Sequence, residues 1–151
     1  MNNDIAALSD MIRALNEGRA FYVDAATKAT REDLKRLFDR MAKTKTTIIN
    51  NLQNKVIFSG HEPVDEGKAG GAMRQAWSNI RARLSSDKEA SYVTKLEDVE
   101  ARILASFRDA IAATKDESVR VIAQKYMPQI TSDHDEIRAL NQVASTDPSQ
   151  H

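Results

Sequence analysis

The segment 34–56, LKRLFDRMAKTKTTIINNLQNKV, decides the fold class that the sequence predicts. Its apolar side chains recur every three or four residues, so they share one side of a helix that advances about 100° per residue. This stripe consists of Leu34, Leu37, Phe38, Met41, Ile48, Leu52 and Val56. Lys45 stands at the centre of the stripe, where the pattern predicts an apolar residue. We therefore expect a long amphipathic helix that carries one charge in its buried face.

Three other segments show the same spacing, at about 5–29, 88–111 and 117–140, and a shorter stripe lies at 69–84. The short links between the first two and the last two long helices predict two antiparallel pairs. The long link between the second and third long helices predicts a crossover along the bundle that carries the short helix. We expect one all-α domain over residues 1–144 with a flexible tail at 145–151; five helices side by side are the alternative.

Composition and charge argue against several classes of function. The 151 residues include 22 basic and 22 acidic side chains and no cysteine. Zero net charge, and a basic face on 28–55 without interleaved aromatic rings, argue against nucleic-acid binding. The lack of cysteine excludes disulfides and thiolate metal sites. No apolar run reaches the ~20 residues that span a membrane, and the N-terminus lacks the pattern of a secretory signal, so we expect a cytoplasmic protein.

Charged or polar residues interrupt the apolar stripes of all four long helices near mid-length. They are Arg19, Lys45, Glu100, Asp133 and His134. A buried charge without a partner costs several kcal/mol, so these side chains are expected to pair in a central polar layer. The simplest pairing sets two cations, Arg19 and Lys45, against Glu100 and Asp133. Alternatively, the long stems of the two cations reach solvent at the edge of the bundle.

A metal centre is the competing hypothesis for the same layer. Glu97, Glu100 and His134 are its candidate ligands, for iron or another transition metal. Dinuclear bundle sites use a glutamate from each of two helices and a Glu-x-x-His motif on each of the other two. Here Thr131 stands three residues before His134, and the segment 34–56 contains no histidine. We therefore expect no metal, no other cofactor and no catalytic residue.

The sequence resembles an uncharacterised bacterial family of ferritin-like four-helix-bundle proteins. The resemblance lies in GHEP at 60–63, GAMRQAW at 71–77 and HDEIRAL at 134–140, and earlier in LNEG at 15–18, Tyr22, 25–26 and 52–53. It implies a ferritin-like fold and no established activity. Many relatives carry carboxylates where this chain has Ala20 and Asn51, which further weakens the metal hypothesis.

The expected function is therefore that of a non-catalytic structural or stress-associated interaction protein. Four apolar residues outside the stripes, Met11, Phe21, Ile57 and Phe58, suggest a contact between subunits, and so a homodimer without a nucleic-acid or membrane partner. The alternative is a metal-binding or redox protein that uses Glu100 and His134. A small apolar ligand between the helices is a third possibility.

Overall fold

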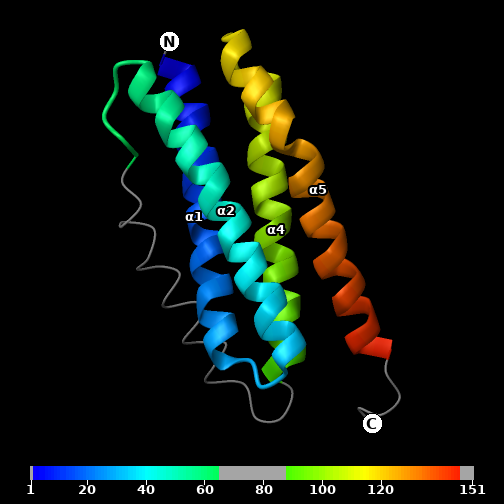
Figure 1. Ribbon diagram of the computed structural model, residues 1–151. Coiled ribbons are helices and arrows are strands. Elements are labelled where there is room, and N and C mark those ends of the chain that lie inside the picture. The colour runs from blue at the N-terminus through cyan, green and yellow to red at the C-terminus, as the bar shows by residue number, and fades with distance from the viewer. Residues whose placement is uncertain (1, 65–87, 147–151) are drawn as a thin grey trace.

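The computed structural model describes residues 2–64 and 88–146, which form four long helices (Figure 1). These are α1 (Asn2–Lys28), α2 (Glu32–Phe58), α4 (Lys88–Ala113) and α5 (Glu117–Thr146). The all-α prediction is confirmed, and α5 extends two residues into the stretch 145–151 that was predicted as tail. The predicted short helix at 69–84 lies outside the described residues.

The helix directions match a bundle with one long crossover. α1 and α2 are antiparallel, as are α4 and α5, whereas α2 and α4 run in the same direction, so that α2 ends and α4 begins at opposite ends of the bundle (Figure 1). α1 packs against α2 and α4, and α4 packs against α5, while α2 and α5 touch at few positions. Simple up-down-up-down topology would have made α2 and α4 antiparallel, and it is excluded.

Local signals set two of the helix ends. Gly60 adopts a φ of 85°, a left-handed conformation that glycine accepts without steric cost. Its N–H donates to Ile57 O at 2.9 Å and the next N–H, of His61, donates to Val56 O at 3.2 Å, which is the Schellman pattern that ends α2. At the start of α5, Asp116 Oδ1 accepts a 2.9 Å hydrogen bond from the Ser118 N–H and so caps the helix.

The apolar core runs along the bundle between the four helices. Two predicted contact residues, Met11 and Phe21, belong to this core, with 0% and 2% of their surface exposed. Their assignment to a subunit contact was wrong. α1 packs against two neighbouring helices, and it therefore buries a wider arc than a single stripe implies. Ile57 and Phe58, in contrast, are 51% and 88% exposed at the end of α2.

None of the helices in the described ranges combines the length and the apolar character needed to cross a lipid bilayer.

Candidate functional site

Three buried charged side chains meet inside the bundle. Lys45 Nζ of α2 lies 2.6 Å from Glu100 Oε1 of α4 and 3.5 Å from Asp133 Oδ2 of α5. Lys45 and Glu100 are fully buried, and only 3% of the Asp133 side chain is exposed. The three residues stand in the apolar faces of their helices, so the packing of those faces removes all three from water. We call Lys45, Glu100, Asp133 and their neighbour Tyr22 the central layer.

Tyr22 of α1 completes the layer in two ways. Its hydroxyl donates a 2.6 Å hydrogen bond to Glu100 Oε1, the oxygen that the Lys45 ammonium also approaches. The centroid of its ring lies 4.7 Å from Lys45 Nζ, within the range of a cation–π contact. Burial raises the pKa of the Tyr22 hydroxyl well above its ordinary value, and the nearby Glu100 carboxylate raises it further. The hydroxyl therefore remains a donor at neutral pH.

A glycine on α1 makes room for the lysine. A Cβ added to Gly18 would lie 3.2 Å from Lys45 Cε, 3.1 Å from Val99 Cγ1 and 2.8 Å from Ile103 Cδ1. The last of these distances is shorter than real Cβ contacts allow. Glycine inside a helix has a cost of about 0.5–1 kcal/mol relative to alanine. Its presence here lets α4 and the lysine stem pack directly against the α1 backbone.

The hydrogen bonding of the layer is incomplete. Gln129 Nε2 donates to Asp133 Oδ1 at 2.8 Å. Within the described part of the chain, the other two carboxylate oxygens, Glu100 Oε2 and Asp133 Oδ2, accept no hydrogen bond and are shielded from solvent. Lys45 Nζ is close to its acceptors but lacks the angles of a directed hydrogen bond, so charge and proximity hold it. The layer thus sets one ammonium against two carboxyl groups.

The structure brings together three of the five predicted layer residues. Arg19 is half-buried, and its Nη2 donates to Asn16 Oδ1 on the same helix at 2.6 Å. Its predicted place opposite Glu100 and Asp133 was wrong, because Tyr22, one turn further along α1, takes that position. His134 is also half-buried. It follows Asp133 directly, so its side chain leaves α5 about 100° away from the layer.

The residues present do not fit the dinuclear metal centre of ferritin-like bundles. Glu97 is half-buried and accepts a 2.9 Å hydrogen bond from Asn141 Nδ2, away from Glu100. Across residues 2–64 and 88–146, no three His, Cys, Asp or Glu side chains gather in a geometry that would hold a metal. The ammonium of Lys45 lies against Glu100 Oε1, where a dication would have to bind. The predicted set of Glu97, Glu100 and His134 is not brought together.

Sequence reasoning missed the polar role of Tyr22 and the packing role of Gly18. Tyr22 lies in the apolar stripe of α1, where an aromatic residue predicts core packing, and nothing local indicates the partner of its hydroxyl. Gly18 did carry a signal, because a glycine in the middle of a helical pattern often marks a close approach. That signal does not say which residue approaches.

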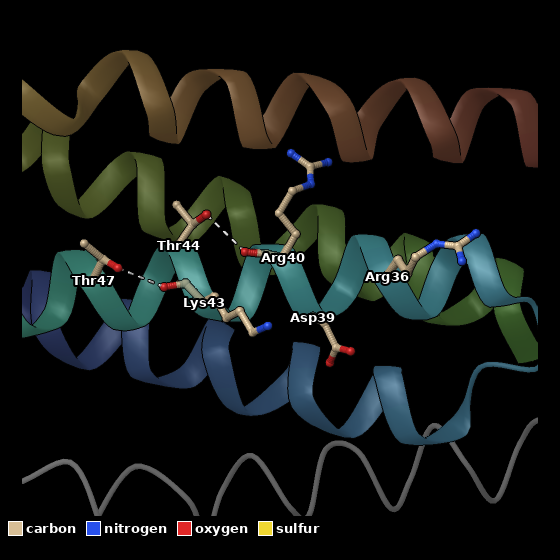
Figure 2. Close-up of a pocket in the computed structure, with 6 residues that line it drawn as sticks. All are labelled: Arg36, Asp39, Arg40, Lys43, Thr44 and Thr47. Atoms are coloured by element: carbon tan, nitrogen blue, oxygen red, sulfur yellow. Dashed lines mark hydrogen bonds between the residues drawn. The ribbon is translucent and has the colours of Figure 1, made fainter.

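A surface hollow on α2 gives no second site. Its lining residues all come from the outer face of that helix, as Figure 2 shows: Arg36, Asp39, Arg40, Lys43, Thr44 and Thr47. Arg40 is paired with Glu136 of α5 at 2.6 Å. The hydroxyls of Thr44 and Thr47 donate to backbone carbonyls one turn earlier, at 3.0 and 3.2 Å. Three of the six lining side chains thus have partners within the protein, and the hollow is a solvated face of α2.

Comparison with solved structures places the protein in the class of ferritin-like bundles. The bacterioferritin-related protein from Bacteroides fragilis, described as a dodecameric thioferritin, superposes with a TM-score of 0.70 over 97% of this chain and 90% of its own. The two sequences are 16% identical, so this likeness shows the fold. The ferritin-like prediction is confirmed.

The family follows from the sequence itself. Residues 3–113 match the model described as a domain of unknown function, DUF2383, and the chain belongs to that family. The resemblance to an uncharacterised ferritin-like family is thereby confirmed. Comparison with the curated proteins gives no match.

Proposed function

We propose that this protein is a non-catalytic ferritin-like scaffold or interaction protein of the stress-associated type. Its proposed location is the cytoplasm. In this proposal the central layer stabilises the fold and carries out no reaction. One observation carries this proposal: Lys45 Nζ lies 2.6 Å from Glu100 Oε1 in a fully buried environment. The two inward carboxyl groups are thus engaged with a cation that belongs to the chain. The stress association and the location rest on the family resemblance and the composition.

Self-association is the second element of the proposal. Phe58 is 88% exposed and Ile57 51% exposed, and the two are adjacent at the end of α2. The other exposed large apolar residues of the described helices, Val23 and Val121, are not adjacent in the sequence. The Bacteroides fragilis protein of the same fold is dodecameric. We infer that the end of α2 contributes to contacts between copies of this chain, with the homodimer as the smallest assembly.

Size-exclusion chromatography with light scattering tests self-association. The wild type is expected to elute at a multiple of 16.8 kDa. Phe58→Ser should shift the population toward monomer with unchanged circular dichroism, because the side chain does not belong to the core. Val23→Ser, at a 51% exposed position on α1, is the matched control and should leave the assembly intact. A wild type that is monomeric at high micromolar concentration contradicts the proposal.

Metal analysis separates the scaffold from the metal-binding alternative that uses Glu100 and His134. Protein purified without chelator, then incubated with Fe²⁺, Mn²⁺ or Zn²⁺ and desalted, is expected to retain well under one equivalent by plasma mass spectrometry. The same measurement on Glu100→Gln and His134→Ala gives the site-specific control. Stoichiometric metal in the wild type that disappears in either variant would show a metal centre that uses the substituted residue.

A further inference from the structure

The central layer gathers two carboxyl groups, from α4 and α5, around one cation from α2, and a tyrosine of α1 lies beside them. Tyr22 Oη and Glu100 Oε1 lie 2.6 Å apart, and Lys45 Nζ lies 2.6 Å from that same Glu100 oxygen and 3.5 Å from Asp133 Oδ2. α1, α4 and α5 thus supply oxygen groups, and α2 supplies the positive charge. The carboxyl oxygens are thus arranged around a positive charge, as at a cation-binding site, but the charge belongs to a side chain of the protein.

Two features show that the single ammonium does not satisfy all the carboxylate oxygens of the layer. Glu100 Oε2 and Asp133 Oδ2 are buried and accept no hydrogen bond within the described residues. Both side chains are at least nine-tenths buried, so bulk water does not solvate these oxygens. Carboxylate oxygens that lack hydrogen-bond donors in a low-dielectric interior depend on a nearby cation for their stability.

The space for the cation is also provided by the fold. Gly18 leaves open the volume that the lysine stem occupies, since a Cβ there would lie 3.2 Å from Lys45 Cε. Truncation of Lys45 to alanine removes the stem and its charge together. The space left would be bordered by the Tyr22 ring, whose centroid lies 4.7 Å from Lys45 Nζ, by the two carboxyl groups and by Gly18.

We propose that Lys45 is a tethered cation that replaces a metal ion in this bundle, and that Glu100 and Asp133, beside Tyr22, form a divalent-cation site once its ammonium is removed. This inference rests on the proposed function, in which the native layer is metal-free. Carboxylate oxygens favour hard cations such as Mn²⁺ over thiophilic metals. A mononuclear site is expected, because residues 2–64 and 88–146 place no second set of carboxylates there.

The experiment measures Mn²⁺ uptake by Lys45→Ala through electron paramagnetic resonance and thermal unfolding. Lys45→Ala is expected to bind one equivalent of Mn²⁺ and to show a melting temperature that rises with Mn²⁺ concentration, since a ligand that binds only the native state stabilises it. Lys43→Ala, which truncates an exposed lysine two residues away on α2, is the matched control and should bind none. Lys45→Ala with Glu100→Gln should lose the uptake.

Folding of the variant is measured in the same samples. If Lys45→Ala is unfolded without metal, Mn²⁺ is expected to restore its helical circular dichroism, because metal binding then drives folding. Propylammonium chloride, which supplies the lost charge with a short apolar stem, should also raise its melting temperature, compared with sodium chloride at equal ionic strength.

Failure of this inference is distinguishable from failure of the proposed function. A metal-free wild type together with a Lys45→Ala protein that neither binds nor is stabilised by Mn²⁺, folded or unfolded, overturns the tethered-cation inference alone. Equal Mn²⁺ uptake by Lys45→Ala and by its Glu100→Gln double variant also overturns it. Stoichiometric metal in the wild-type layer overturns both proposals.

Discussion

Two ion pairs connect α2 to α5, and they lie in opposite environments. Lys45 and Asp133 meet in the core at 3.5 Å with side chains 0% and 3% exposed. Arg40 and Glu136, about one turn away along each helix, form a two-pronged contact of 3.0 and 2.6 Å with side chains 58% and 42% exposed. The surface pair has the better hydrogen-bond geometry.

The comparison shows that hydrogen-bond geometry alone does not determine how much an ion pair contributes to the stability of the protein. Water already solvates Arg40 and Glu136 when they are apart, so their pairing contributes little. Lys45, Glu100 and Asp133 have lost that solvation, and each depends on the others for its charge to be tolerated. Loss of one partner should therefore be far more damaging in the core than at the surface. The four predictions below test this contrast.

The largest effect is expected for Lys45→Met. This change leaves Glu100 and Asp133 buried without their cation, at a cost of about 3–5 kcal/mol in the free energy of unfolding. Lys45→Met combined with Glu100→Leu should be less destabilised than the single variant, because one of the stranded carboxyl groups is removed with the cation. Urea unfolding measures both. An equal or greater loss in the double variant would show that Lys45 and Glu100 are not coupled.

Gly18→Ala tests the close approach that makes the layer possible. Intrinsic propensity favours alanine in a helix by about 1 kcal/mol. Here the added methyl group would lie 2.8 Å from Ile103 Cδ1, and we expect a net loss of about 1–3 kcal/mol from overpacking. Ala20→Gly, at an exposed position of the same helix, should cost only about 0.5–1 kcal/mol. Stabilisation by Gly18→Ala would mean that the end of the Ile103 side chain can shift without penalty.

Tyr22→Phe removes the donor to Glu100 and keeps the ring beneath Lys45. We expect a loss of about 1.5–3 kcal/mol, the range for a hydrogen bond to a charged group. Because folding raises the pKa of Tyr22 above its ordinary 10.0, this contribution should be complete below pH 10.0 and decline as pH rises through the folded value. The difference between wild type and variant should therefore shrink in alkaline solution. A difference that stays constant with pH would contradict the assignment.

The smallest effect belongs to the surface pair. A double-mutant cycle with Arg40→Ala and Glu136→Ala should give a coupling free energy of about 0.2–1 kcal/mol, measured by chemical unfolding. The coupling should fall when the salt concentration rises to 1 M, where the screening length is about 3 Å. A coupling as large as that between Lys45 and Glu100 would remove the contrast between core and surface.

Much of the fold was predictable because its signals are local. The apolar stripes predicted the four long helices, and the lengths of the links predicted the single crossover. The ends of α2 and α5 at Gly60 and Asp116 are of the same local kind, since glycine commonly ends a helix and aspartate commonly caps its start. The inward placement of Lys45, Glu100 and Asp133 was predictable for the same reason, since helical period alone assigns each residue to a face of its own helix.

The pairing of Lys45 with the two carboxyl groups was predicted, but the complete set of partners was not, because it depends on how four helices rotate and slide against one another. Arg19 and Tyr22 lie one turn apart on α1, and only the packing of α1 against α4 decides that Tyr22 contacts Glu100. Met11 and Phe21 are buried because α1 has two neighbouring helices, a fact that no single stripe contains. The tertiary structure likewise decided that Gly18 lies against the lysine stem.

The sequence by itself thus determined which helices form and which charges turn inward, since both follow from the 3.6-residue period and from residues close in the chain. Only the tertiary structure decided that Tyr22, and not Arg19, joins the lysine and the two carboxyl groups. Burial beyond the reach of water is a property of the assembled helices, and it converts three ordinary charged residues into a coupled central layer.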